Sequence, residues 1–426
     1  MRLEIINGRL IDPAQDIDQK GALYIEKNKI VGLLNAPAGF VADKTIDAQG
    51  QIVCPGFIDL SARLREPGQS NKGTIESETK AAASAGFTSL CVPPDSNPVT
   101  DSVEVVELLK DKAEKYHYSQ VYPVAALTKK LAGSELSSLY ALKKAGCIAV
   151  SQAHHPIQDL LILRRAMEYA ATHDLLLIFC PQEASLSNGG CAHEGAMASR
   201  YGLPSIPYAA ETIALMQCIE LIEVTGCRVH FSGISCARSV TLISKAKKMG
   251  LALTADVAMH QLHLTDDDML PYDSAYHVIP PLRSEKDKQG LLAGVRKGII
   301  DSICSDHQPH DKDAKLGAFP ETEAGISSLE SVLPLMMRLV EQGDLELMQA
   351  IAKLTIAPAN ILGLDTGSLA EGQVADVCVF DPQKKWQVNQ QSWLSLGRNT
   401  PFWQEMMQAK VVHTIQAGKV IYTQSL

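Results

Sequence analysis

The sequence predicts an α/β fold, a (β/α)8 TIM barrel with a small β-sandwich domain formed by both chain termini. Two observations lead to this prediction. Strand-like and helix-like segments alternate about eight times over roughly 300 residues in the middle of the chain, which is typical of a parallel barrel. Both ends of the chain contain short strand-like runs separated by turns instead. A doubly wound sheet is the alternative, but no GxGxxG motif follows the first strand.

The two ends of the chain are expected to form short strands. Residues 3–6 and 9–11 flank Asn7-Gly8, a pair that favours a tight hairpin turn. Further strands are expected at 23–25, 30–33, 44–46, 377–380, 410–416 and 419–422. We therefore expect residues 1–54 and 365–426 to form one composite β-sandwich and residues 55–364 to form the barrel.

The barrel segments follow one another in a regular order. An Ala-rich helix is expected at 74–85, and it ends before Gly86, a residue suited to the position after a helix. A helix at 102–116 places Val105, Val106 and Leu109 on one face. The other helices are expected at 135–144, 158–173, 208–224, 239–249 and 286–296, and the strands at 52–54, 57–60, 87–92, 121–127, 147–151, 175–180, 228–232, 251–256 and 299–305.

The composition excludes several classes of protein. A net charge of -9 without a Lys/Arg-rich run argues against nucleic acid and anionic membrane surfaces as partners. No apolar run near Met1 is long enough for a signal peptide, and no stretch approaches the roughly 20 apolar residues of a membrane span. The ten cysteines contain no CxxC pair, so we expect reduced thiols in a cytoplasmic protein.

Short motifs are spread over nearly the whole chain. They are Pro55-Gly-Phe-Ile-Asp-Leu60, Leu64-Arg-Glu-Pro-Gly68, Asn97-Pro98, Gly189-Gly190 with His193-Glu-Gly195, Gly202-Leu-Pro204, Glu211, Pro280-Pro-Leu-Arg283 and Ser305-Asp-His-Gln-Pro-His310. In this order the motifs resemble those of the dihydroorotases of the amidohydrolase superfamily. The resemblance implies hydrolysis or formation of a cyclic amide at the C-terminal mouth of the barrel. It also implies one or two zinc ions, held by imidazoles and carboxylates at several strand ends.

The first two ligand positions implied by the resemblance are altered. The family's first strand ends in His-x-His, whereas this chain has Ser61 and Arg63. Serine is a poor zinc ligand, and arginine brings a fixed positive charge into the space of a cation. The family's bridging carboxylate falls at Gln152, which is neutral and cannot bridge two cations.

The remaining ligand positions are altered as well, with one exception. Two histidines of the family are replaced by Cys180 and Gly233. His230 lies three residues before Gly233, so period-two alternation predicts that it faces a helix and not the site. Only Asp306 keeps its identity. In the family this residue binds metal and acts as general base, a role that is vestigial without metal-bound hydroxide.

The positions that would contact substrate form a partial remnant. Arg65 stands where the family binds a carboxylate, while Asp95 and Ile279 replace two asparagines. These two changes remove amide hydrogen bonds and add a negative charge near an anionic substrate, which is unfavourable by a few kcal/mol at close range.

Other residues offer alternatives. His154-His155 resembles a replacement ligand pair, but adjacent side chains point apart. Cys180 with Asp306 could hold a single zinc, although catalytic zinc usually has three protein ligands. We favour a different interpretation, in which Arg63 pairs with Asp306 or Asp95 and takes the place of the metal. The motif histidines are expected to be inherited or structural: His193, His307 and His310.

We therefore expect a non-catalytic dihydroorotase homologue that needs no zinc or other cofactor. The resemblance is strongest to the inactive dihydroorotase-like subunit of bacterial aspartate carbamoyltransferase complexes. It implies the aspartate carbamoyltransferase catalytic chain as partner, a role in pyrimidine biosynthesis, and a homo-oligomer, expected to be a dimer. The alternatives are an active amidohydrolase on a cyclic amide with an atypical or mononuclear metal site, and a ligand sensor that uses Arg65 and the old pocket.

Overall fold

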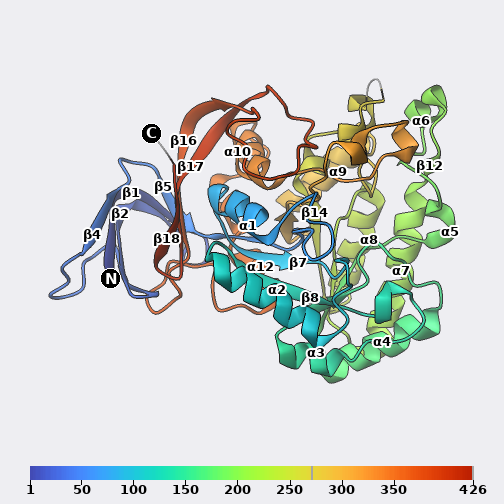
Figure 1. Ribbon diagram of the computed structural model, residues 1–426, viewed down its shortest axis with the longest axis horizontal. Coiled ribbons are helices and arrows are strands. Elements are labelled where there is room, and N and C mark those ends of the chain that lie inside the picture. Colours follow the sequence, from blue (N-terminus) through green and yellow to red (C-terminus); the bar gives the residue numbers. More distant parts are fainter. Residues whose placement is uncertain (270–271, 425–426) are drawn as a thin grey trace.

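The computed structural model describes residues 1–269 and 272–424 and contains a barrel beside a separate sheet (Figure 1). The barrel sheet has eight strands joined in parallel in the order β6 to β10, then β13 to β15. An isolated parallel bridge between Ala62 and His307 links its two edge strands. The strands are β6 (Phe57–Asp59), β7 (Phe87–Val92), β8 (Gln120–Ala126), β9 (Ala149–Ser151), β10 (Leu176–Phe179), β13 (Val229–Phe231), β14 (Leu253–Ala258) and β15 (Ser302–Cys304). The predicted TIM barrel is confirmed.

Helices surround this sheet and bury their apolar faces against it. In α1 (Ile75–Ser84), Thr74 and Ser77 form the capping box that begins the helix. In α2 (Val103–Tyr116), the predicted apolar face is buried. The other helices are α3 (Leu139–Ala145), α4 (Leu160–Thr172), α5 (Ala184–Ser187), α6 (Ala196–Tyr201), α7 (Tyr208–Thr225), α8 (Ala237–Lys248), α9 (Glu285–Arg296), α10 (Val332–Glu341), α11 (Leu347–Ala352) and α12 (Ile356–Leu362).

The start predicted for the helix at 135–144 was wrong. The helix α3 begins only at Leu139, because Leu136 forms an antiparallel bridge with Thr128. The backbone of this segment therefore pairs with the loop after β8 and does not enter the helix.

Strands from both ends of the chain share one mixed sheet and one apolar core. The sheet order is β18-β17-β16-β5-β1-β2-β3, and β4 pairs with β1. Its strands are β1 (Arg2–Asp12), β2 (Ile17–Glu26), β3 (Lys29–Leu33), β4 (Lys44–Asp47), β5 (Ile52–Pro55), β16 (Val377–Gln387), β17 (Met406–Gln416) and β18 (Lys419–Thr423). The domain boundaries stay a prediction, and β5 straddles the first of them.

The hairpin predicted at Asn7-Gly8 was wrong. Residues 2–12 form one strand, β1, with an irregularity between Ile5 and Gly8, where Asn7 has a φ of 58°. An Asn-Gly pair tolerates this left-handed backbone in a bulge as well as in a turn. The bulge lets the first half of β1 pair with β4 and the second half with β5.

Among the described residues, no helix is long and apolar enough to cross a membrane.

Candidate functional site

The positions where the family resemblance implies metal ligands gather at the C-terminal end of the barrel strands, where TIM-barrel active sites lie. Ser61 and Arg63 follow β6, Gln152 follows β9, and Cys180 follows β10. Gly233 and Asp306 come shortly after β13 and β15. Successive parallel strands therefore deliver these residues to one mouth, as the barrel prediction required.

Arg63 occupies the centre of this group. Its side chain is only 5% exposed, and its Nε donates to Asp95 Oδ2 at 2.8 Å. Its Nη1 lies 3.3 Å from Asp306 Oδ1. Burial opposes the charge of Arg63, but the carboxylates of Asp95 and Asp306 outweigh burial and raise its pKa. The ion pair predicted from the sequence is present with both aspartates.

The two aspartates respond differently to the same arginine. Burial tends to raise the pKa of Asp95, but Arg63 outweighs burial and the pKa falls below its ordinary value. For Asp306, burial prevails over Arg63 and raises the pKa to about 6. Gln308 Nε2 also donates to both Asp306 oxygens at 3.1 Å. At neutral pH both aspartates are therefore ionised, and Arg63 is the cation that compensates them.

The other ligand positions hold groups poorly suited to a metal. Burial raises the pKa of the Cys180 thiol to about 12, although Arg63 opposes this, so the thiol stays protonated at neutral pH. A metal binds the thiolate and not the thiol. Gln152 Oε1 accepts from Thr128 N and Oγ1 at 3.2 and 3.0 Å. Gln152 Nε2 is buried and finds no partner in the described part of the chain.

The orientation predicted for His230 was wrong. Its Nε2 lies 3.0 Å from Asp256 Oδ2, and Asp256 also accepts from Ser232 Oγ and from Gly233 N. His230 and Asp256 are fully buried and belong to the polar interior of the barrel. The alternation rule failed because β13 ends at Phe231 and the chain turns at Gly233, whose φ is 71°.

Sequence reasoning overlooked two buried carboxylates. Asp256 gathers the contacts just described, and the signal was an acidic residue inside a strand of apolar residues. Glu78 lies on the buried face of α1, and its Oε2 is 2.8 Å from His307 Nε2. The Nδ1 atom of His307 accepts from Ser328 N, so this motif histidine holds neighbouring segments together.

Arg65 and the other motif histidines make internal contacts. Arg65 Nε donates to Pro309 O at 2.9 Å, and its Nη2 is 3.0 Å from His310 Nε2. Burial and the nearby Arg63 lower the pKa of Arg65 to about 10. His193 Nδ1 lies 3.1 Å from Arg283 Nη1. Part of the donor capacity of Arg65 is thus used by the loop after β15.

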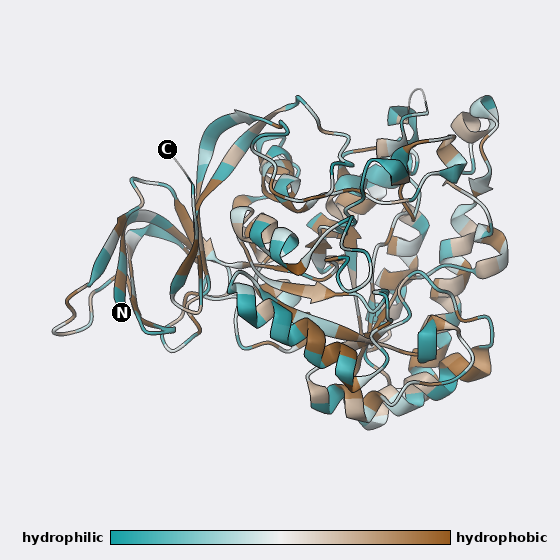
Figure 2. Cartoon of the chain, viewed as in Figure 1, coloured by the Kyte–Doolittle hydropathy of each residue, from teal (hydrophilic) through white to brown (hydrophobic). Residues whose placement is uncertain are grey.

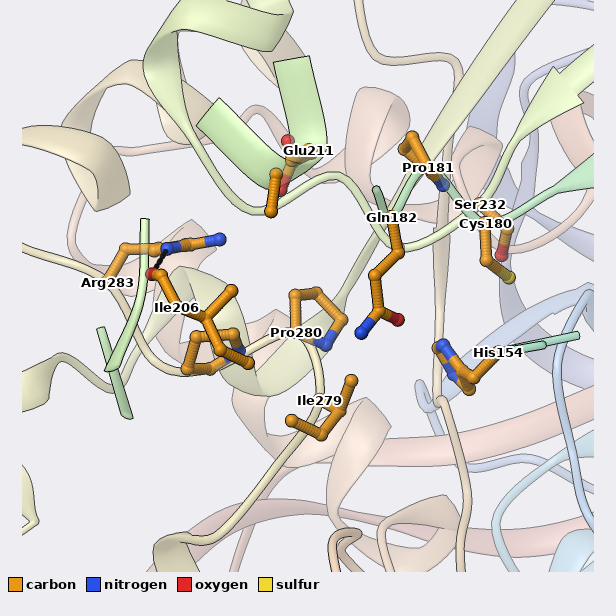
Figure 3. A pocket seen from close by; sticks show the side chains of 13 residues that line it. His154, Cys180, Pro181, Gln182, Ile206, Glu211, Ser232, Ile279, Pro280 and Arg283 are labelled. Atoms are coloured by element: carbon orange, nitrogen blue, oxygen red, sulfur yellow. Dashed lines mark hydrogen bonds between the residues drawn. The ribbon is translucent and has the colours of Figure 1, made fainter. Parts of the chain in front are cut away.

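A small cavity lies beside this group (Figure 3). Its volume is about 20 Å³, room for roughly one water molecule. His154, Gln182 and Ile279 project into it, while His155 is exposed, so the adjacent histidines diverge as predicted. Burial lowers the pKa of His154 to about 3. A cyclic amide does not fit this cavity without movement of its walls.

The residues present do not fit a zinc centre. Within residues 1–269 and 272–424, no three His, Cys, Asp or Glu side chains are grouped so that they could hold a metal ion. The two remaining donors are the protonated thiol of Cys180 and the carboxylate of Asp306, which already faces a guanidinium.

Two solved structures share this fold. L-hydantoinase (dihydropyrimidinase) from Arthrobacter aurescens superposes with a TM-score of 0.89 at 22% identity, covering 100% of this chain and 96% of that chain. D-hydantoinase (dihydropyrimidinase) from a Thermus species gives a TM-score of 0.84 at 23% identity, covering 98% and 94%. At such identities the likeness concerns the fold alone.

Sequence comparison narrows the class to one family. Residues 50–239 match the family model described as dihydro-orotase-like, and residues 333–422 match the amidohydrolase family. A dihydroorotase-like protein of Pseudomonas aeruginosa is 46% identical, over 99% of this chain and 100% of that protein. A dihydroorotase of Syntrophotalea carbinolica is 39% identical, over 99% of both chains. The chain belongs to the dihydroorotase-like family, so the family inferred from the motifs is confirmed.

Proposed function

We propose that this protein is a non-catalytic dihydroorotase homologue that binds no zinc and supports the assembly and activity of aspartate carbamoyltransferase. One observation carries the first part of the proposal. A buried guanidinium, that of Arg63, lies against Asp95 and Asp306 at the mouth of the barrel, where the family resemblance implies the metal.

The charge of Arg63 opposes a metal at this place. A zinc ion about 4 Å from a guanidinium would be repelled by roughly 8 kcal/mol at an effective dielectric constant of 20. Imidazole ligands normally offset the cost of dehydrating zinc, but Ser61 and Gly233 stand at histidine positions of the family. Asp306 would have to bind the metal and Arg63 together.

The names of sequence relatives give separate support for a non-catalytic protein. Two relatives named dihydroorotase-like protein, from Pseudomonas aeruginosa and Pseudomonas putida, are 46% and 47% identical to this chain. A relative from Syntrophus aciditrophicus named dihydroorotase is 37% identical. Of these three relatives, the two named dihydroorotase-like protein are therefore more similar to this chain than the one named dihydroorotase.

The partner in this proposal rests on family resemblance, which is an associational argument. A barrel kept intact around an altered mouth implies selection on something other than chemistry there. We propose that the protein acts as a homodimer that binds the aspartate carbamoyltransferase catalytic chain.

Zinc content and turnover test the non-catalytic part. The purified protein, loaded with excess zinc and then desalted, is expected to keep less than about 0.1 zinc per chain. It is also expected to interconvert dihydroorotate and carbamoyl aspartate no faster than a mock purification. About one zinc per chain, lost in an Asp306→Ala variant, would support the alternative of a mononuclear amidohydrolase. Tight binding of dihydroorotate without turnover would support the ligand sensor.

A further inference from the structure

The first half of the helix α7 is apolar on both its inner and its outer side. Its inner side packs on the barrel through buried residues such as Leu215, Cys218 and Ile222. A helix in the outer ring of a barrel usually turns a polar face to solvent. In α7, however, Ile213 is 40% exposed and Met216 is 49% exposed. The outward side of the first half of α7 is therefore as apolar as a surface that is covered by another element.

Neighbouring elements extend this surface. The first turn of α4 exposes Leu160 at 41% and Leu161 at 57%, and α5 exposes Leu186. A groove of about 660 Å³ lies between α4, α5 and α7. These helices lie on the side of the barrel away from the terminal sheet (Figure 1), and apolar colouring reaches that side in Figure 2. We call this surface, formed by Leu160, Leu161, Leu186, Ile213 and Met216, the α4–α7 face.

The charges beside the α4–α7 face differ between its two helices. One turn beyond its leucines, α4 exposes Arg164 and Arg165, which share the single carboxylate of Glu168. One turn beyond Met216, α7 exposes Glu220 and then Glu223. Neither of these two glutamates has an ion-pair partner among the residues that the structure describes. At this level along the helices the α4 side is thus net basic and the α7 side acidic, while Asp159 is exposed at the opposite, N-terminal end of α4.

We infer that two copies of this chain associate through the α4–α7 face, with α4 of one copy lying on α7 of the other. The inference rests on the homodimer of the proposed function and assigns its surface. A two-fold interface must be complementary to itself. A two-fold axis parallel to the helices places α4 of one copy opposite α7 of the other. Residues at the same level along the two helices then face each other. Arginines then meet the glutamates of the second copy, and leucines meet Ile213 and Met216.

The charge pattern favours a second copy over an unrelated protein. The α4–α7 face carries both the arginines and the glutamates that such a contact pairs. An unrelated protein would have to supply matching charges of its own. An axis at right angles to the helices would instead place the acidic end of α7 on the apolar end, which costs desolvation of unpaired charges.

The dimensions of the face suit such an interface. The 18 residues of α7 span about 27 Å, and neighbouring helices pack about 10 Å apart. Two helices with their side chains therefore present a footprint of roughly 27 by 20 Å. Once side-chain relief is included, this approaches the about 800 Å² per partner of a standard interface.

Charge reversal and its rescue test the inference on the full-length chain. Sedimentation velocity at about 10 μM is expected to give a dimer for the wild type. A Glu220→Arg/Glu223→Arg variant is expected to dissociate at least tenfold more readily, because arginine then faces arginine. Adding Arg164→Glu and Arg165→Glu to this variant should restore the dimer. The control Leu316→Lys, at another exposed apolar residue, should leave the dimer unchanged.

Several outcomes would overturn the inference. These are a monomeric wild type, a charge-reversed variant that dimerises like the wild type, and a four-fold variant that stays monomeric while circular dichroism shows it folded. Binding to the transferase catalytic chain is measured separately by size exclusion. If the charge-reversed variant is a monomer that still binds the transferase catalytic chain, the inference is supported. This holds whatever effect that binding has on transferase activity. A variant that stays a dimer but loses the transferase chain would assign the face to the transferase instead.

Discussion

A single side chain, Arg63, changes the chemistry of the barrel mouth. In a metal centre, the positive charge that compensates Asp306 comes from a bound ion. Here it comes from a covalently attached guanidinium, which also compensates Asp95. The chain itself therefore supplies positive charge at the mouth, with one guanidinium facing two carboxylates.

Replacing Arg63 with methionine is expected to destabilise the protein by about 3 kcal/mol, because two buried carboxylates then lose their ion-pair partner. Urea unfolding followed by fluorescence measures this change. The exposed control Arg238→Met should shift the free energy of unfolding by less than about 0.5 kcal/mol. The triple variant Arg63→Met/Asp95→Asn/Asp306→Asn should recover a large part of the loss. A loss below about 1 kcal/mol in the single variant would show that these ion pairs contribute little.

Restoring two histidines is not expected to restore catalysis. In a Ser61→His/Arg63→His variant, Gln152, Cys180 and Gly233 still differ from the residues that the family resemblance implies. Catalytic groups that act as a unit return little when only some are present. The assay is dihydroorotate hydrolysis with added zinc, and the single variant Ser61→His is the matched control. Turnover by the double variant well above that of the control would mean that the ligand strands have been misassigned.

At the scale of elements, the sequence predicted the barrel well because hydrophobic periodicity reports burial directly. The strand β7 and the helix α2 agree with their predicted ranges to within one residue. Predictions failed where tertiary contacts decide between local alternatives. The bulge at Asn7 and the late start of α3 both depend on strand partners distant in the chain or in a neighbouring loop.

The candidate site was predicted in its position and in the ion pair of Arg63, but not in its other contacts. The motifs indicated that Arg63 and Asp306 would meet at one mouth, and they do. No local pattern could reveal the segment 388–405, whose Asn399 donates to Gln308 O and Gly325 O beside the motif. The contact joins residues about ninety positions apart, which single-sequence patterns do not report.

The anchoring of this segment is expected to depend on pH. Glu330 is buried and accepts from Leu394 N and Ser395 N. Burial raises the pKa of Glu330 to about 7, and Lys410 opposes the increase. The folded state therefore holds this proton more tightly than the unfolded chain does. Its contribution to stability is complete below about pH 4.5 and is lost as the pH rises through about 7.

A Glu330→Gln variant tests this dependence, because glutamine resembles the protonated carboxyl. Between pH 5 and 7 the wild type should lose on the order of 2 kcal/mol more unfolding free energy than the variant. Urea unfolding at four pH values gives the difference. An exposed control, Glu346→Gln, should keep the wild-type slope. Parallel pH profiles for the wild type and Glu330→Gln would contradict the assignment.

At the scale of the whole molecule, the described residues form the barrel and the terminal sheet, while residues at the mouth differ from those that the family resemblance implies. The chain superposes over 100% of its length on the solved L-hydantoinase, with a TM-score of 0.89. Under the non-catalytic function that we propose, a scaffold kept in full needs a reason other than chemistry at the mouth. A partner that uses the outer surface supplies such a reason, because surface contacts require the fold but not the ligands.

The last prediction concerns that partner. We expect the protein to co-elute with the aspartate carbamoyltransferase catalytic chain when the two are co-expressed, and its gene deletion to lower transferase activity while dihydroorotase activity persists. The physical requirement is an interface of about 800 Å² per partner, which a barrel of this size offers on several sides. Arg63→Met/Asp95→Asn/Asp306→Asn is the matched control, since it alters the mouth alone and should still co-elute. Separate elution at micromolar concentration, with a transferase fully active alone, would leave the ligand sensor as the better explanation. In that case the cavity beside Cys180 and Ile279 would have to open before a ligand could enter, because its present volume of about 20 Å³ admits little more than one water molecule.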